Sequence, residues 1–330
     1  PDDLKILNLN ASRSIIILSP DSDSRDADVI KTVLAITNHA QRRSQPYNIV
    51  ASICDPRNFA VAKVAGKQEV EWIPMGILVA RVIAQTSRQS GLSVIYSELL
   101  NYRDNEIYFH EGATLVGRRF GEILALFSQD SVIGITREGS SVHLNPPMET
   151  VIELGDKIVV IARDNTLISA DPQALAHVQE SIIHLAPLPQ PRPERTLILG
   201  WNWRVPIVIG NLDQYVLTGS EVTVMTDQRG VKDPLLALRE RLKNQKLRLL
   251  RGDITDRQTL EKLDLSKFHH VVVMSYSDTR TQQQADASSM IALLHLRDIA
   301  DKHGHTFTLT SEMLDDRNRK LAMVTRADDF

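Results

Sequence analysis

The stretch Ser14-Ile15-Ile16-Ile17-Leu18-Ser19 decides the fold, because a short continuous apolar run is typical of a strand buried on both faces of a parallel sheet. Helical spacing of apolar residues follows at 27–37, and residues 48–53 predict the next strand. A second helix begins at Asp55, and 70–73 forms a further short element. This alternation of strand and helix predicts a doubly wound α/β sheet.

The same pattern returns near the end of the chain. Val271-Val272-Val273-Met274-Ser275 resembles the first run, and Leu314-Asp315-Asp316-Arg317-Asn318 resembles Cys54-Asp55-Pro56-Arg57-Asn58. Asp286 follows Asp28 by 258 residues, and Asn318 follows Asn58 by 260. A nearly constant offset predicts two copies of one fold. We expect the first copy to lack its opening strands and the second to stop soon after Asn318.

Between the copies the pattern changes. Two helices are predicted at 75–88 and 92–100, with a break at Gly91, and a small α+β module follows with a helix at 116–126. Four alternating prolines in 186–195 predict a stiff linker. We therefore divide the chain into the C-terminal half of a first Rossmann-like unit (1–74), a helix pair (75–100), a small α+β subdomain (101–166), a proline-rich linker (167–194) and a second Rossmann-like unit (195–330).

Composition narrows the class of protein. Hydrophobic residues make up 42% of the chain and charged residues 24%, as is usual for a soluble globular protein. The net charge of −3 gives no basis for a nucleic-acid partner. Cys54 is the single cysteine, which excludes an internal disulfide, and no apolar run reaches the roughly 18 residues that span a bilayer. The first residue is Pro1, so we expect a longer parent protein.

Several motifs resemble RCK domains, the regulators of potassium conductance that form gating rings under ion channels. The small module carries Leu115-Val116-Gly117 and Glu153-Leu154-Gly155-Asp156-Lys157, which are similar to the small C-terminal RCK subdomain. The stretches 88–92, 198–201 and 311–315 resemble the CASTOR and POLLUX type of channel. The resemblance implies two Rossmann-like RCK units with a small α+β subdomain between them.

The resemblance also implies a function and partners. It implies a regulatory region of a ligand-gated cation channel, of potassium-transport type, that faces the cytoplasm or the equivalent side of an internal membrane. The partners would be the protein's own pore-forming membrane segment and further copies, in a dimer or a tetrameric ring. The helix pair resembles the crossover helices through which RCK units dimerise. The apolar residues that would bury against a partner are Ile77, Leu78, Val82, Ile83, Ile95 and Leu99.

A dinucleotide site in the second copy is degenerate. Of the glycines that a phosphate-binding fingerprint needs, only Gly200 is present, and Trp201 and Trp203 would fill the space of a pyrophosphate. Asp227 ends the next strand, where a ribose-binding acid would lie, although acids also cap strands and helices. We expect no dinucleotide, and the loss of glycines favours a structural or regulatory role for this copy.

Calcium is the candidate cofactor. Asp21, Asp23, Asp26 and Asp28 follow the first strand closely and could supply the hard oxygens that calcium needs. The alternative is a solvated loop in which Asp26 caps the helix.

A departure from the family weakens one version of this site. In the calcium-gated archaeal potassium channel two glutamates on the next strand complete the site, and Ser52 and Cys54 stand at the matching positions here. In the second copy Glu312 falls where Ser52 does, so Asp278 with Glu312 is a second calcium hypothesis.

Two other functions remain open on the sequence alone. One is a nucleotide-binding regulatory subunit of a potassium uptake system, which would need an intact glycine loop. The other is a dehydrogenase, which would need a cofactor loop and a proton-transfer residue. Neither set of residues is evident, and no nucleophile motif is present, so we expect a protein that is not an enzyme.

Overall fold

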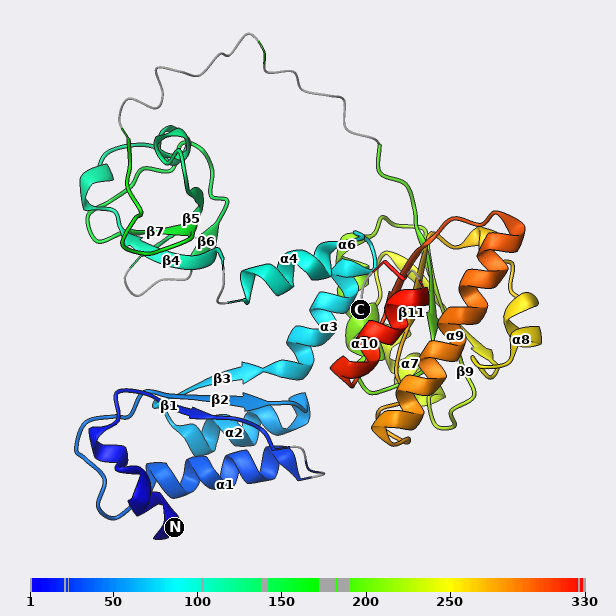
Figure 1. Cartoon of the computed structure of the whole chain (residues 1–330), viewed down its shortest axis with the longest axis horizontal. Helices are drawn as coiled ribbons and strands as arrows, with labels where there is room; N and C mark the ends of the chain where they lie inside the picture. The colour runs from blue at the N-terminus through cyan, green and yellow to red at the C-terminus, as the bar shows by residue number, and fades with distance from the viewer. Residues whose placement is uncertain are drawn as a thin grey trace. The chain divides into compact units, whose positions relative to one another are not determined.

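The computed structural model describes residues 2–20, 22, 24–101, 104–137, 142–171, 182, 190–325 and 327–328 (Figure 1). It forms two compact units. The first unit combines residues 1–91 with 191–330, and the second covers 92–190. Within the described residues, no helix is long and apolar enough to cross a membrane. Most of the predicted 167–194 linker lies outside the described residues.

The first unit begins with a three-stranded parallel sheet in the order β1-β2-β3, which we call the first lobe together with its helices. The elements are β1 (Ile15–Ile17), α1 (Arg25–Thr37), β2 (Ile49–Ile53), α2 (Phe59–Gly66) and β3 (Val70–Pro74), after two 3-10 turns at Asp2–Leu7 and Leu9–Ala11. Val33, Ile49 and Ala62 are fully buried between the helices and the sheet. Figure 1 shows α1 and α2 on one face of this sheet.

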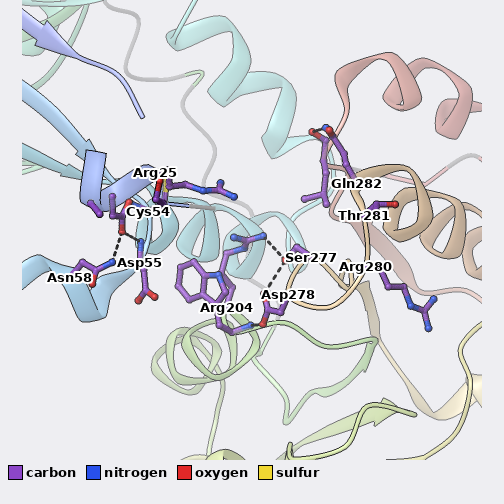
Figure 2. A pocket seen from close by; sticks show the side chains of 15 residues that line it. Arg25, Cys54, Asp55, Asn58, Arg204, Ser277, Asp278, Arg280, Thr281 and Gln282 are labelled. Carbon is purple, nitrogen blue, oxygen red and sulfur yellow. Dashed lines mark hydrogen bonds between the residues drawn. The ribbon is translucent and has the colours of Figure 1, made fainter. Parts of the chain in front are cut away.

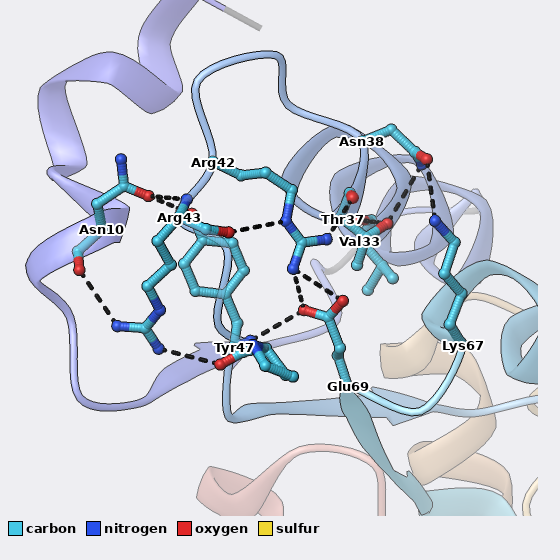
Figure 3. Close-up of polar contacts among 10 residues, drawn as sticks. Asn10, Val33, Thr37, Asn38, Arg42, Arg43, Tyr47, Lys67 and Glu69 are labelled. Carbon is cyan, nitrogen blue, oxygen red and sulfur yellow. Dashed lines mark hydrogen bonds and ion pairs between the residues drawn. The ribbon is translucent and has the colours of Figure 1, made fainter.

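The partly buried carboxylate of Glu69 connects several segments of the first lobe (Figure 3). Both oxygens of Glu69 accept hydrogen bonds from Arg42 Nη2, at 2.9 and 2.7 Å, and the Tyr47 amide donates to it at 2.9 Å. Burial would raise the pKa of Glu69, but these donors outweigh it and lower the pKa. The Tyr47 hydroxyl donates to Asn10, so the network holds the N-terminal turns against the start of the sheet.

The second lobe is a five-stranded parallel sheet in the order β10-β9-β8-β11-β12. Its strands are β8 (Arg195–Leu199), β9 (Ser220–Thr226), β10 (Gln245–Arg251), β11 (His270–Val273) and β12 (Thr308–Ser311). Its helices are α6 (Val205–Tyr215), α7 (Lys232–Arg239), α8 (Arg257–Glu261), α9 (Gln282–His303) and α10 (Asp316–Ala322). The central strands are apolar on both faces, as Leu197, Val224 and Val272 are fully buried. The α/β fold predicted from the sequence is confirmed.

Helix α3 (Met75–Thr86) joins the two lobes, because it follows β3 directly and packs against α6. Ala80, Ile83 and Ala84 belong to the hydrophobic core of the second lobe. The expectation that Ile83 buries against a separate partner is therefore wrong, since the second lobe of the same chain already covers it. Leu78, on the same helix, remains 45% exposed.

The second unit begins with α4 (Leu92–Leu99) and contains an antiparallel sheet in the order β4-β7-β5-β6. The strands are β4 (Glu106–Glu111), β5 (Ser131–Thr136), β6 (Val142–Leu144) and β7 (Lys157–Ala162). The predicted helix at 116–126 is too long. Gly117 has a φ of +86°, so helix α5 covers only Phe120–Ile123 and a 3-10 turn ends the segment at Leu126.

Candidate ligand cavity between two related lobes

In each lobe one aspartate near the start of a helix accepts hydrogen bonds from the turn that follows a strand, after β2 in the first lobe and after β12 in the second. We call this set of bonds the carboxylate clasp. In the first lobe Asp26, which is 5% exposed, accepts from the amides of Cys54 and Asp55, both at 2.9 Å, and from Asn58 Nδ2 at 2.9 Å. The side chain sits on the first turn of α1 and reaches the turn after β2. It therefore fixes the helix to the strand end, which is where ligands of parallel sheets bind.

In the second lobe Asp286 makes the matching three bonds. It accepts from the amides of Leu314 and Asp315 at 2.9 and 3.0 Å and from Asn318 Nδ2 at 2.9 Å. The structural equivalent of Asp286 is therefore Asp26, and the sequence pairing of Asp286 with Asp28 was wrong by two residues. The loop that precedes each helix differs in length, and this difference misled the alignment of the two Ala-Asp pairs.

The lobes differ at the position two residues before the first clasped amide, which is Ser52 in the first lobe and Glu312 in the second. In the first lobe Ser52 Oγ accepts from the Ser19 amide at 3.2 Å. In the second lobe Glu312 Oε2 takes the matching amide of Ser275 at 3.1 Å. These bonds support the predicted equivalence of Ser52 and Glu312, with a small hydroxyl in one lobe and a carboxylate in the other.

Glu312 is fully engaged by residues of the phosphate-loop position. Asn202 Nδ2 donates to its Oε2 at 2.6 Å, and Arg204 donates to its Oε1 through Nε at 2.8 Å and through Nη2. Glu312 is 7% exposed and Asn202 is fully buried. A buried carboxylate that is paired in this way is a structural anchor, and its removal would leave Arg204 without its counter-charge. No local sequence pattern predicts that Asn202 and Arg204 reach Glu312.

Gly200 has a packing role. Its φ is +91°, and a Cβ placed on it would lie 2.1 Å from the carbonyl oxygen of Met274, which directly follows the neighbouring strand β11. Asp227 forms an ion pair with Arg280 at 3.7 Å. Burial, together with Asp227, raises the pKa of Tyr276 to about 12. Whether Gly200 and Asp227 hold a cofactor stays a prediction, and neither lines the cavity described next.

A cavity of about 620 Å³ lies between the strand ends of the two lobes (Figure 2). The first lobe contributes the start of α1 and the turn after β2, and the second contributes the loop after β8, the loop after β11 and the start of α9. Arg25, Cys54 and Asn58 face Trp203 and Asp278 across it. Figure 2 shows the Arg25 side chain extending into the cavity.

Trp203 connects the cavity wall to α3. A Cβ on Gly76 would lie 2.1 Å from the Trp203 ring and 2.2 Å from the carbonyl oxygen of Cys54, so only glycine fits there. The Trp203 amide donates to Asp278 at 2.7 Å. The charge of Asp278 also reaches the first lobe, because the pKa of Arg57 is raised first by Asp55 and, less strongly, by Asp278.

The predicted calcium ligands are not brought into one described cluster. Asp21 and Asp23 lie outside the described residues. Asp26 is committed to its clasp, and Asp28 accepts from Ser24 at 2.7 Å, a bond that lowers its pKa. Among the described residues, no three His, Cys, Asp or Glu side chains meet in a way that could hold a metal ion.

Taken together, the first unit is a pair of Rossmann-like lobes joined by a crossover helix, with a polar cavity between their strand ends. This is the fold of a solved gating ring. The human SLO3 gating ring has the same fold: it aligns with a TM-score of 0.68 at 15% identity, over 98% of this chain and 66% of that structure.

The sequence comparisons identify the particular relatives. Residues 77–178 match the family model described as Castor and Pollux, part of voltage-gated ion channel. The chain is 29% identical to a probable ion channel CASTOR of Oryza sativa over 91% of this chain, and 26% identical to the ion channel CASTOR of Lotus japonicus over 99%. It spans 34% and 42% of those relatives. The resemblance to the RCK gating-ring region of CASTOR and POLLUX channels is confirmed.

Proposed function

We propose that this chain is the regulatory region of a ligand-gated cation channel, and that its ligand acts in the cavity between the lobes. Relatives named as ion channels and a gating-ring fold support the first part. The single observation that carries the second is that the strand ends of both lobes border one polar cavity. Strand ends are where parallel sheets bind ligands, so one molecule there would touch both lobes.

A ligand in the cavity would act on α3. Trp203 of the second lobe packs on Gly76, which lies at the junction of β3 and α3. A molecule that alters the gap between the lobes must therefore shift Trp203, α3 or both. It can shift the equilibrium only by its differential affinity for the two spacings. In the parent channel α3 and the second unit would pass this change to a pore outside this chain.

Calcium is the first ligand to test, at Asp21, Asp23 and Asp28 and at Asp278. Asp26 and Glu312 are less suited to it than the sequence suggested, because each already satisfies its oxygens within the fold. If calcium bound to either carboxylate, the buried groups that now donate to it would lose their acceptor. A nucleotide is the second ligand to test, because it is the ligand that a subunit of a potassium uptake system would require.

The experiment is a distance measurement across the cavity. In a Cys54→Ser background, spin labels at Val64→Cys on α2 and Gln283→Cys on α9 report the gap, since both positions are exposed. We expect calcium, or otherwise ATP, to shift or narrow the distance distribution, and Asp278→Ala to weaken the response. Distance distributions that do not change at about 5 mM of each ligand, a concentration above the dissociation constants of typical calcium sensors, would contradict a ligand role for the cavity.

We also propose that the chain assembles into a dimer or a tetrameric ring. Val94 and Ile95 on α4 are more than half exposed, and Leu78 on α3 remains accessible. Light scattering of the wild-type chain and of an Ile95→Glu variant tests this proposal. The variant should shift the chain toward the monomer, and a wild-type chain that is monomeric at every concentration would refute the assembly.

A further inference from the structure

At the edge of the second lobe where the strands begin, the end of α3 is tied to the sheet through Glu194. Arg88 donates to both oxygens of Glu194, from Nε at 2.8 Å and from Nη2 at 2.6 Å. Glu194 immediately precedes β8, and its amide donates to Ser220 Oγ at 2.9 Å. His270, the first residue of β11, places Nε2 3.2 Å from Glu194 Oε2. This edge lies opposite the cavity.

The other face of the His270 ring continues the chain of contacts. Its Nδ1 lies 2.8 Å from Thr308 Oγ1, at the start of β12. The Thr308 hydroxyl in turn donates to the carbonyl oxygen of Ser87 at 2.6 Å. Ser87 is fully buried and follows α3 directly. The ring therefore bridges the segment before β8 and the last turn of α3.

The donors and acceptors in this series of contacts determine how many protons the His270 ring must carry. A carbonyl oxygen can only accept, so the one hydroxyl proton of Thr308 goes to Ser87 and the oxygen must accept from Nδ1. A carboxylate can also only accept, so Nε2 must donate to Glu194. A neutral imidazole has one N–H and cannot make both bonds, whereas an imidazolium has two.

We propose that His270 is a proton sensor, whose imidazolium form clasps the end of α3 to the second lobe through Glu194 and Thr308. Losing the ring proton leaves one N–H, so one of the two bonds must break. The clasp is therefore complete only while the ring carries both protons, and it loses one bond when the pH is high enough to remove one of them. Its stabilising effect disappears in that same direction.

The groups that face the ring are consistent with this assignment. Glu194 supplies a negative charge and Arg88 a positive one, and the two compensate each other. His269 is the other titratable neighbour, with its ring centroid 6.2 Å from that of His270. His269 Nδ1 accepts from the Arg195 amide at 2.9 Å, so this nitrogen carries no proton in that bond. A proton on Nδ1 would break the bond of His269, whereas the two bonds of His270 need both ring protons.

The position of the His270 clasp, at the end of α3, allows it to act on the helix that joins the two lobes. Helix α3 has 12 residues, about 18 Å of helix. Gly76 in its first turn contacts the cavity residue Trp203, and Ser87 of the clasp follows its last residue. A proton at His270 therefore biases the same helix whose first turn contacts Trp203. The clasp stands on its own contacts and requires no ligand in the cavity.

The first test is the ring itself. Nitrogen-15 NMR of the full chain distinguishes an imidazolium, with two protonated nitrogens, from either neutral tautomer. We expect the His270 ring to show two protonated nitrogens at about pH 6, while His269 shows one. A neutral His270 ring at that pH, with an unprotonated Nδ1, would overturn the proposal.

The second test reads the effect on α3. Amide hydrogen exchange of Ser87 and Arg88, corrected for the intrinsic pH dependence, should lose at least about fivefold protection between pH 6 and pH 8. Thr308→Val removes the acceptor of Nδ1 and should reduce the change to below about twofold, whereas Thr308→Ser should keep it. His303→Gln, in an exposed histidine pair, is the control. An equal pH response in wild type and Thr308→Val would reject the clasp.

Discussion

The two lobes share one clasp and differ in what lies beside it. Asp26 and Asp286 hold equivalent turns with equivalent bonds, so the scaffold of the strand end is the same in both. Ser52 leaves a small hydroxyl at the adjacent position, whereas Glu312 gathers Asn202 and Arg204 around a buried charge. One copy of a fold can thus fill the position beside its strand end with a buried ion pair while the other copy does not.

The largest expected effect breaks this difference directly. Glu312→Ala leaves Arg204 without its counter-charge and the Ser275 amide without its acceptor, and it should lower the free energy of unfolding by about 3–5 kcal/mol. The matched change Ser52→Ala removes one partly buried hydroxyl and should cost about 1 kcal/mol or less. Urea unfolding measures both. Equal losses would mean that the two positions are not filled differently.

The clasps themselves should respond alike. Asp26→Asn and Asp286→Asn each replace an acceptor oxygen with a donor that faces a backbone amide, and each should cost about 2–3 kcal/mol. Separate unfolding transitions for the two lobes, followed by fluorescence and by hydrogen exchange, allow the losses to be compared. A cost confined to one of them would show that the clasps are not equivalent.

The packing of the lobes on α3 should depend on the size of one residue. Gly76→Ala forces a Cβ against Trp203 and the Cys54 carbonyl and should cost about 1–3 kcal/mol. Gly210→Ala, on α6, meets no atom within 4 Å and should stabilise the chain by about 0.5–1 kcal/mol. Thermal unfolding of both variants decides the point, and a stabilising Gly76→Ala would exclude the tight contact.

The smallest expected effect is the loss of the stabilising contribution of Glu194 in acid. Burial would raise the pKa of Glu194, but hydrogen bonds from Arg88 and His270 outweigh it and lower the pKa from 4.5 to about 2. The bonded carboxylate therefore stabilises the fold above about pH 4.5, and this contribution, about 1–2 kcal/mol after allowing for solvent, is lost as pH falls toward 2.

Glu194→Gln tests this contribution in chemical unfolding at about pH 6 and pH 3, because the Glu194 carboxylate of the unfolded chain gains a proton between these two values. The variant should be less stable than the wild-type chain at the higher pH, and the difference should shrink at the lower pH. Glu71→Gln, an exposed carboxylate on β3, is the control. A constant difference at the two pH values would exclude a proton-linked role for Glu194.

The sequence predicted the fold well because its signals are local. The turns at 54–58 and 314–318 repeat with their chemistry intact, and the apolar run at 271–274 is fully buried as predicted. The prediction that the run at 14–19 is buried on both faces is wrong, because Ile16 and Leu18 are exposed. The equivalence of Ser52 and Glu312 followed from the same repeat. The two-residue error at Asp28 arose because a loop of different length precedes each helix, and sequence spacing carries no information about which carboxylate turns inward.

The site could be predicted only in outline. The strand-end location of a ligand follows from topology, but the cavity depends on Trp203 meeting Gly76 and on Arg204 reaching Glu312, contacts that join residues far apart in the chain. The clasp of His270 requires three separate segments to meet, at Glu194, Thr308 and Ser87. No local pattern marks such contacts, since each residue type is common on surfaces.

The comparison of the lobes can be tested most directly by amide hydrogen exchange of the unmodified chain. The amides held by Asp26 and Asp286 should show protection within about tenfold of each other. The Ser275 amide, held by Glu312 in a fully buried position, should exchange at least about a hundredfold more slowly than the Ser19 amide held by Ser52. Equal rates at Ser19 and Ser275 would contradict the account.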